Sequence, residues 1–454
     1  MSAEQENRSF TVSSPSVREA IRAVADGFAE FAGEVVSEDP LDWPGYEEQL
    51  ARAGEKSGET EAVIIGEARI GETPVVVIAF DFDFLGGSMG EAVGDKIVEA
   101  FARAMESRRA IVSLVATGGA RMQEGMRSLV QLQRIAQVCA RARAEGIPHV
   151  SVLRHPTTGG VWISLAASAD FLIGVEGATV SFAGPRVRDD DDHSDAFTST
   201  GKLRAGFIDA ELAAETVPEY LAAVVALLSP GREESLEAPE LPAALGRAEA
   251  PKEAWDSVER ARSSARPHAA AYLDDYFEER VKISGDRAGG VDENMLCGFG
   301  RREGRTIAYA AQCGVANSAA GFRMAKRLFD LAERLRLPVL TLIDTPGAGN
   351  EAKDEQEGVG TAIAELFCAV ADSSVPMTSL VIGEGGSGGA LALAAPGNLW
   401  ITPDGYFAVI SPESAAAILG RDESQAEEVS EDMWLMPQDL VRLGIVRGIA
   451  TPKT

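Results

Sequence analysis

The sequence contains two long segments that repeat the same order of motifs. In each, a short β-branched run ends in a glycine-containing turn, a helical stretch follows, and a second such run ends in another glycine turn. The first copy comprises residues 111–115, 117–120, 149–153 and 156–160, and the second comprises residues 339–343, 344–348, 378–382 and 383–389. Gly118 and Gly159 lie 41 positions apart, as do Gly347 and Gly388, which pairs these glycines between the copies. Matched order and spacing predict duplication of a whole domain, because the period is far longer than that of a solenoid repeat.

Each copy alternates β-branched runs with helical stretches, which is typical of an α/β fold. Residues 126–144 and 322–335 place their apolar side chains close to helical period, so we expect a helix in each. A stretch rich in Pro, Glu and Ala separates the copies and predicts a linker. The expected division is a helical N-terminal extension over residues 1–60, a first domain over 61–228, the linker over 229–254 and a second domain over 255–454.

Charge and hydropathy exclude several classes of partner. The 454 residues carry a formal net charge of −28, which argues against nucleic acid or an anionic membrane as a partner. Acidic runs at residues 189–192 and 351–357 are typical of solvated surface. No run approaches the roughly 18 uninterrupted apolar residues of a membrane helix. The N-terminus lacks a basic-then-apolar signal pattern, so we expect a cytoplasmic protein.

The cysteines lie far apart and form no Cys-x-x-Cys pair; they are Cys139, Cys297, Cys313 and Cys368. This spacing speaks against a disulfide framework or a zinc ribbon, and we expect no metal site. Their apolar or small-residue surroundings predict buried structural thiols.

Glycine turns follow a strand and precede an apolar helical stretch in both copies. Gly159 and Gly160 lead into one such stretch, and Gly388 and Gly389 lead into the other. Glycine lets a ligand approach the backbone closely, and the start of a helix offers unpaired N–H groups with positive partial charge. Two such N–H groups aimed at one oxygen would form an oxyanion hole. A tight turn without catalytic role is the plainer interpretation of any single pair.

No side-chain nucleophile with a matching base stands out. We interpret His149 and His155, which flank one strand, as structural or surface residues. Ser387 lies in Gly-Gly-Ser-Gly-Gly, which matches the G-x-S-x-G pattern of a nucleophile elbow. The acid and histidine that this fold requires do not follow in the required order. A site of backbone N–H groups that stabilises an enolate therefore fits better than a hydrolase.

Longer motifs resemble the carboxyltransferase component of biotin-dependent acetyl-CoA carboxylase, with its β-type and α-type subunits fused in one chain. The β-like motifs lie at residues 84–90, 118–125, 156–160 and 182–186, and the α-like motifs at 343–348, 381–390 and 409–413. The resemblance covers roughly residues 60–225 and 265–450. It implies an α/β fold of two tandem crotonase-like domains of the ClpP/crotonase superfamily, each a β-β-α spiral.

The resemblance also implies a reaction, namely carboxyl transfer from carboxybiotin to the α-carbon of a small acyl-CoA, with acetyl-CoA or propionyl-CoA as the default. Gly159 and Gly160 would stabilise the thioester enolate. Gly388, Gly389 and Ala390 would hold the ureido oxygen of biotin, which would itself act as the base. The other substrate-binding residues implied are Gly86, Gly87, Gly118, Gly119, Ala120, Arg121, Gly347 and Ala348.

The expected partners follow from what the sequence lacks. It contains no biotinyl-lysine motif and no ATP-binding domain, so biotin carboxyl carrier protein and biotin carboxylase are expected as separate chains. In this family the active site forms where an N-type half faces a C-type half of a partner chain. The resemblance therefore implies a homo-oligomer, either a trimer or a hexamer.

Departures from the family pattern leave other functions open. The four-cysteine zinc ribbon usual near the start of the β subunit is missing, and residues 349–354 replace a second Pro-Gly turn. An acidic run follows residue 186, unlike the common pattern. The alternative is a biotin-independent decarboxylase of a malonyl-CoA-like substrate that uses the same holes. A non-catalytic binding or assembly subunit is a third possibility; bulky residues at the oxyanion positions would support it, and none is present.

Overall fold

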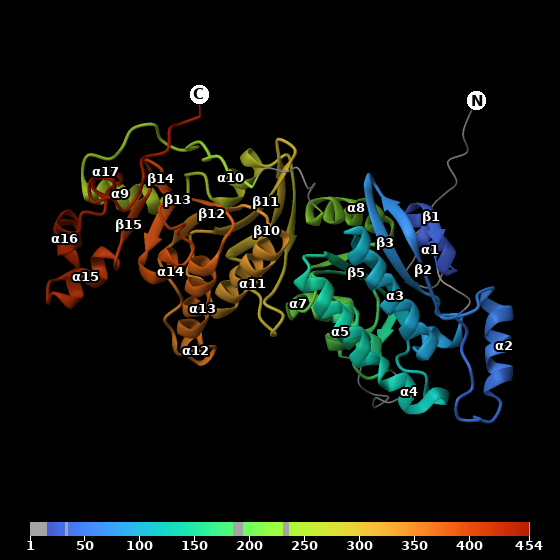
Figure 1. Cartoon of the computed structure of the whole chain (residues 1–454). Coiled ribbons are helices and arrows are strands. Elements are labelled where there is room, and N and C mark those ends of the chain that lie inside the picture. The colour runs from blue at the N-terminus through green and yellow to red at the C-terminus, as the bar shows by residue number, and fades with distance from the viewer. Residues whose placement is uncertain (1–15, 32–34, 185–193, 230–235, 454) are drawn as a thin grey trace. The chain divides into compact units, whose positions relative to one another are not determined.

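The computed structural model describes residues 16–31, 35–184, 194–229 and 236–453. They form two compact units that divide between Ser229 and Pro230 (Figure 1). Within the described residues, no helix has both the length and the apolar character needed to cross a membrane.

The first unit is built on a mixed sheet with the strand order β1-β2-β3-β4-β5-β6-β8, in which β7 also pairs with β5. The strands from β1 to β3 are antiparallel, and those from β3 onward are parallel. All eight residues of β4 are buried, as expected for a central parallel strand covered on both faces. The strands are β1 (Asp26–Glu30), β2 (Val63–Ile70), β3 (Thr73–Phe80), β4 (Ala110–Thr117), β5 (His149–Thr158), β6 (Phe171–Val175), β7 (Val180–Ser181) and β8 (Ala210–Leu212).

Helices cover both faces of this sheet. The helix α3 packs on β2, β3 and α5, whereas α8 packs on β2, β3, β6 and α1. The buried face of α3 contains Val93, Ile97, Ala100, Phe101 and Ala104 at helical spacing, and this apolar stripe explains its packing on the sheet. The helices are α1 (Val17–Val24), α2 (Tyr46–Ser57), α3 (Glu91–Ser107), α4 (Gly125–Leu129), α5 (Gln131–Ala144), α6 (Gly159–Ser164), α7 (Ser199–Arg204) and α8 (Val217–Leu228).

The second unit repeats this plan with the strand order β14-β13-β12-β11-β10-β9, in which β15 pairs with β13. The strands are β9 (Glu279–Ile283), β10 (Met295–Arg302), β11 (Arg305–Gln312), β12 (Val339–Thr345), β13 (Met377–Gly386), β14 (Leu399–Ile401) and β15 (Tyr406–Ala408). The helices are α9 (Ala254–Arg262), α10 (Ala269–Tyr276), α11 (Ala319–Leu335), α12 (Ala352–Gln356), α13 (Val359–Asp372), α14 (Ser387–Leu391), α15 (Pro412–Ile418), α16 (Ala426–Asp432) and α17 (Pro437–Arg442).

The duplication follows a constant offset of 228 positions from α3 to the turn after β5. The starts of α3 and α11, of α5 and α13, and of β5 and β13 all differ by this interval. Gly119 therefore corresponds to Gly347, and both have positive φ, 110° and 139°. Their N–H groups each donate to a threonine hydroxyl two residues earlier, at 3.0 and 3.1 Å.

The pairing of Gly118 with Gly347 was thus wrong by one residue. The same correction applies to Gly159, which corresponds to Ser387 rather than to Gly388, and both have positive φ, 70° and 56°. Consecutive glycines fit either register equally well in a sequence, whereas backbone conformation and hydrogen bonding distinguish them.

The segments outside the repeat pack on the units that they adjoin. Of the N-terminal extension, β1 pairs with β2 at the edge of the first sheet. Of the expected linker, residues 236–253 contain no helix and lie against the second unit. Ala244 is buried and donates its N–H to the Thr451 carbonyl at 2.8 Å, and the Thr378 hydroxyl donates to the Pro239 carbonyl at 2.6 Å.

Candidate active site

Three loops meet around the first glycine turn. The N–H of Gly118 donates to the Gly86 carbonyl at 2.8 Å, and the N–H of Met89 donates to the Gly119 carbonyl at 2.8 Å. A Cβ on Gly119 would lie 3.3 Å from the Gly159 Cα, so these backbones approach too closely for larger residues. The structure therefore brings together most of the residues predicted for the acyl-CoA side, namely Gly86, Gly87, Gly118, Gly119, Ala120, Gly159 and Gly160.

The two glycines of this turn differ in their N–H groups. The Gly159 N–H donates to the Phe182 carbonyl at 3.0 Å, so it reaches a ligand only if that bond breaks. The Gly160 N–H lies in the first turn of α6 and has no hydrogen-bond partner among the described residues. Gly160 thus offers the open donor of the pair, and the role of Gly159 stays a prediction.

The second turn is packed in the same way. A Cβ on Gly389 would lie 2.6 Å from the Ala348 nitrogen, so the turn sits directly against the Gly347–Ala348 loop. A Cβ on Gly388, in contrast, would meet nothing within 4 Å. The Gly388 N–H has no hydrogen-bond partner within the described part of the chain, and the space that a Gly388 Cβ would enter is open.

A buried amide supports this second turn. Gln312, the last residue of β11, is fully buried and donates from Nε2 to the Gly389 carbonyl at 3.0 Å. The last residue of β3 is Phe80, so the first turn lacks an equivalent amide. Sequence reasoning missed Gln312, although a polar residue at the end of an apolar strand is a signal for a buried polar contact.

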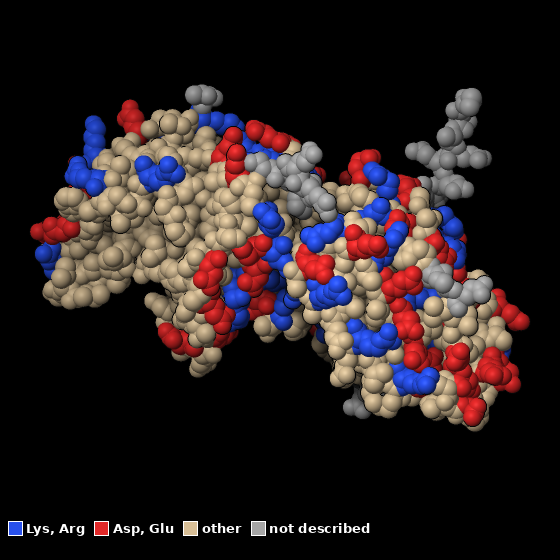
Figure 2. Space-filling view, in the orientation of Figure 1, with Lys and Arg blue, Asp and Glu red and all other residues tan. Residues whose placement is uncertain are grey.

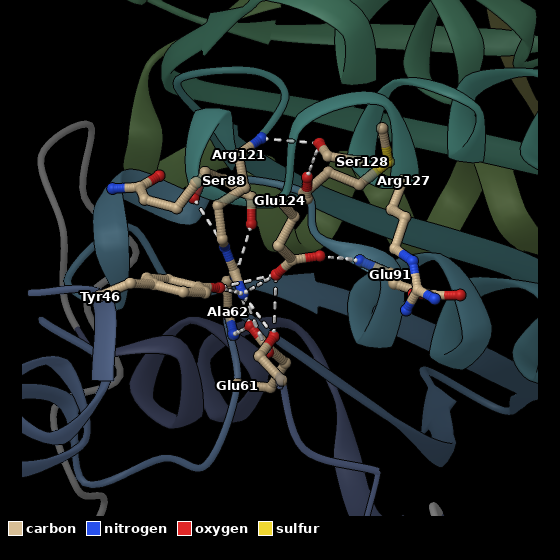
Figure 3. A network of polar contacts seen from close by, with 12 residues as sticks. Tyr46, Glu61, Ala62, Ser88, Glu91, Arg121, Glu124, Arg127 and Ser128 are labelled. Atoms are coloured by element: carbon tan, nitrogen blue, oxygen red, sulfur yellow. Dashed lines mark hydrogen bonds and ion pairs between the residues drawn. The ribbon is translucent and has the colours of Figure 1, made fainter. Parts of the chain in front are cut away.

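Arg121 is enclosed by protein groups rather than open to a ligand (Figure 3). Its Nη1 donates to the Tyr46 hydroxyl at 3.2 Å and to Glu124 at 3.1 Å, and its Nη2 pairs closely with Glu61. Burial opposes the positive charge of Arg121, but the Glu61 carboxylate outweighs it and raises the pKa of the guanidinium. Burial likewise opposes the charge on Glu61, and Arg121 holds the pKa of that carboxyl below its usual range. A guanidinium held in this way can influence substrate only through its own loop.

Family models match both halves of the chain. Residues 38–201 match a carboxyl transferase domain, and residues 248–453 match an acetyl co-enzyme A carboxylase carboxyltransferase-like domain. The acetyl-coenzyme A carboxylase carboxyl transferase subunits beta/alpha of Saccharopolyspora erythraea are 35% identical over 449 residues, covering 94% of this chain and 78% of the relative. The chain belongs to the carboxyltransferases of biotin-dependent acyl-CoA carboxylases.

Other relatives of this carboxyltransferase agree. The fused beta/alpha subunits of Salinispora tropica are 37% identical, covering 89% of this chain and 75% of the relative. A probable biotin-dependent acyl-coenzyme A carboxylase beta3 subunit of Mycobacterium bovis is 32% identical, covering 89% and 82%. The resemblance read from the motifs is confirmed.

The fold is confirmed by solved structures. The transcarboxylase 12S hexamer, solved with methylmalonyl-coenzyme A and methylmalonic acid bound, superposes with a TM-score of 0.80 at 20% identity. It covers 96% of this carboxyltransferase and 86% of that chain. A single-chain, multi-domain long-chain acyl-CoA carboxylase gives a TM-score of 0.76 at 18% identity, over 96% and 44%. The two tandem units are crotonase-like α/β domains.

His149 and His155 both lie in β5 of the carboxyltransferase. His149 is buried in β5, where its Nε2 lies 2.9 Å from the Ser113 hydroxyl and burial lowers its pKa to about 4. His155 accepts from the Thr179 N–H at 3.2 Å. Ser387 is exposed, and its side chain makes no hydrogen bond to the described residues. These positions agree with the structural interpretation of His149 and His155.

The expectation for the cysteines needs a correction, and part of one motif lies beyond the described residues. Cys139 and Cys297 are buried as expected and Cys313 is half-buried, but Cys368 is exposed on α13. The prediction was wrong for Cys368 because a helix in this fold buries only one stripe of its small residues. Residues 185–193, with the end of one family motif and the acidic run at 189–192, lie outside the described residues.

Proposed function

We propose that this carboxyltransferase acts on a small acyl-CoA, acetyl-CoA or propionyl-CoA, with its first-half domain (residues 61–228) at the acyl-CoA and its second-half domain (255–454) at biotin. The observation that carries the proposal is the open N–H group in each glycine turn, at Gly160 and at Gly388. Helix starts carry positive partial charge, so both turns suit an oxygen on which negative charge develops.

The first turn would stabilise the enolate of the thioester. The Gly160 N–H, in the first turn of α6, would donate to the thioester oxygen, and the absence of side chains at Gly119 and Gly159 would leave the approach path clear. This donor lowers the cost of removing the α-proton because the oxyanion is hydrogen-bonded as it forms.

The second turn fits a carbonyl oxygen of the ureido type. Its open space at Gly388 and unpaired N–H suit an acceptor, and Gln312 occupies the neighbouring Gly389 carbonyl with a hydrogen bond. Carboxybiotin, presented by a separate carrier protein, supplies the carboxyl group and takes up the α-proton when bound. The chain's own residues then bind, orient and stabilise charge, which is why no side-chain base is required.

The alternative function is a biotin-independent decarboxylase. The segment after the Gly347–Ala348 loop favours the decarboxylase. Its acidic residues Glu351, Glu355 and Glu357 are exposed on and around α12. This acidic segment replaces the Pro-Gly turn of the family pattern and changes the charge beside the proposed biotin site. The first turn would act identically in both reactions.

One assay separates the two functions. Purified protein is incubated with malonyl-CoA or methylmalonyl-CoA, with and without biocytin, and loss of the carboxyl group is followed. Turnover that depends on biocytin supports the transferase and ranks its substrates. Equal turnover without biocytin contradicts biotin dependence and supports the decarboxylase. No turnover with any thioester, with or without biocytin, contradicts both.

The proposed assembly is a homo-oligomer, either a trimer or a hexamer. Each unit carries several exposed large apolar side chains, and large patches of this kind mark interfaces. In the view of Figure 2, the second unit carries few charged side chains around α14 and α15. The exposed apolar residues are Met122, Met126, Leu129 and Phe182 in the first unit and Leu391, Val409, Ile418 and Leu419 in the second.

The proposed partners are a biotin carboxyl carrier protein and a biotin carboxylase, each as a separate chain. We place the reaction in the cytoplasm, where acyl-CoA is made and used. The exposed free thiol of Cys368 supports that compartment, since exposed thiols persist where glutathione keeps them reduced.

A further inference from the structure

Residues 37–61 carry none of the glycine turns on which the proposed function rests, yet they supply three of the groups around the Arg121 guanidinium. The Ser37 hydroxyl lies 2.5 Å from Nη1, the Tyr46 hydroxyl lies 3.2 Å from the same nitrogen, and Glu61 pairs with Nη2. The Tyr46 hydroxyl also donates to Glu124 at 2.7 Å. These side chains link Ser37, the start of α2 and the residue two before β2 to a loop that lies 60 to 84 positions away in the chain.

The same arginine joins two glycine loops of the proposed acyl-CoA side. Its backbone N–H donates to the Met89 carbonyl at 2.8 Å, and its Nη2 donates to the Ser88 carbonyl at 2.8 Å. Glu124, on the far side of the cluster, accepts the Glu91 N–H at 2.6 Å and so caps the start of α3. The cluster therefore fixes residues 85–90 and 118–121 relative to each other.

The cluster is almost completely buried. The Arg121 and Glu61 side chains are both 0% exposed, and Glu124 is 2% exposed. One cation and two carboxylates in such a place are stable only with complete hydrogen bonding, which the Ser37 and Tyr46 hydroxyls help to provide. Removal of one hydroxyl leaves the charges paired but loosens the geometry.

The second unit provides an internal comparison. At the offset of 228 positions, Gly349 stands where the first unit has Arg121, and Ala352 stands where it has Glu124. The start of α11 is held instead by Ser318 and Asp292, whose Oδ2 accepts the Ser318 N–H at 2.8 Å. The second unit thus has no ionic cluster at these positions; its buried Arg266–Asp344 ion pair lies instead at the end of β12.

We propose that Ser37, Tyr46 and Glu61 are positioning residues for the acyl-CoA side of the active site. They hold Arg121, and Arg121 sets the loops that carry Gly86, Gly87 and Gly118 to Ala120. The proposal rests on the proposed function, because it takes these loops to line the thioester site. It assigns to residues 37–61 the task of shaping that site without touching substrate.

The test uses two mild variants and a matched control. Tyr46→Phe and Ser37→Ala each remove one hydroxyl from the cluster, and Tyr276→Phe removes the hydroxyl of a buried tyrosine that donates to the Glu240 carbonyl at 2.9 Å in the second unit. For each full-length protein, the melting temperature is measured first. The KM for malonyl-CoA and for biocytin is then measured well below that temperature, and malonyl-CoA binding is measured by calorimetry.

We expect both cluster variants to raise the KM and the Kd for malonyl-CoA by about 3-fold to 30-fold, because small displacements of binding groups are costly. The KM for biocytin should stay unchanged, and Tyr276→Phe should change neither. A lower melting temperature with unaltered KM and Kd for malonyl-CoA would overturn the proposal and leave a structural role only. Calorimetry still tests the cluster if the wild type binds malonyl-CoA without biocytin-dependent turnover, which would contradict the proposed function instead.

Discussion

The adjacent glycines of the second turn, Gly388 and Gly389, differ in how closely other atoms pack against them. Gly389 is required by packing, because a Cβ there would lie 2.6 Å from the Ala348 nitrogen. Gly388 has neither a close neighbour nor a positive φ, so nothing in the fold excludes a side chain at that position. We therefore propose that glycine at this position serves a ligand that approaches the backbone.

Gly388→Ala separates these two roles. We expect the free energy of unfolding to change by less than about 1 kcal/mol, because the methyl group enters open space at an ordinary φ. The kcat/KM with biocytin should fall by about 10-fold or more, since the methyl group occupies the approach to the N–H donor. Urea unfolding and the biocytin-dependent assay measure the two effects.

Gly389→Ala is the comparison for that variant. Gly389→Ala should destabilise the protein. A Gly388→Ala protein that is stable and fully active would show that no ligand uses the open space.

At the scale of elements, β5 and β13 carry matched buried polar groups that a purely apolar strand would lack. The Ser113 hydroxyl lies 2.9 Å from both the Ser151 hydroxyl and His149 Nε2 in the first unit. At the same offset, Thr341 and Ser379 share a hydrogen bond of 2.5 Å in the second. Only the first unit adds a titratable group to this pair.

The pH dependence of the first unit follows from His149. Burial lowers its pKa to about 4, so the folded state keeps it neutral while the unfolded chain binds a proton below about pH 6.5. Because the unfolded state then holds more protons, stability is lost as pH falls from about 6.5 toward 4, by about 3 kcal/mol in total. Hydrogen exchange of the β5 amides at pH 7, 6 and 5 measures this loss.

His149→Gln should flatten that dependence, because glutamine cannot take up the proton. An unchanged slope in this variant would assign the pH dependence to other groups.

At the scale of the whole molecule, the second unit exposes large apolar side chains to solvent, which is unfavourable for a monomer. Ile418 is 74% exposed and Val409 is 82% exposed, and both lie beside the second unit's C-terminal helices. The proposed oligomer would bury these side chains and stabilise the assembly.

Ile418→Glu tests that assembly. The fold should be affected by less than about 0.5 kcal/mol, because the side chain is largely exposed within its unit. Light scattering should show a smaller particle than the wild type, and activity should fall with it. Val291→Glu, at a residue that is 39% exposed elsewhere on the unit, serves as the control. A wild-type monomer, or an Ile418→Glu protein of unchanged size, contradicts this interface.

The sequence alone predicted the duplication, the α/β class and the family, because these depend on local features. Alternation of β-branched and helical runs, and glycine at each strand end, are set by neighbours along the chain. The motif resemblance, rather than these local patterns, placed Gly118, Gly119, Gly159 and Gly160 in one predicted site, and the structure brings them together.

Only the tertiary structure decided how those residues are used. The Phe182 carbonyl that occupies the Gly159 N–H lies 23 positions away, and Glu61, which pairs with Arg121, lies 60 positions away. No periodicity in the sequence encodes such partners, since they meet only when the sheet forms. The sequence therefore determined which groups exist at each strand end, and the folded chain decided which of them are paired, because hydrogen bonding in a buried site depends on contacts between distant segments.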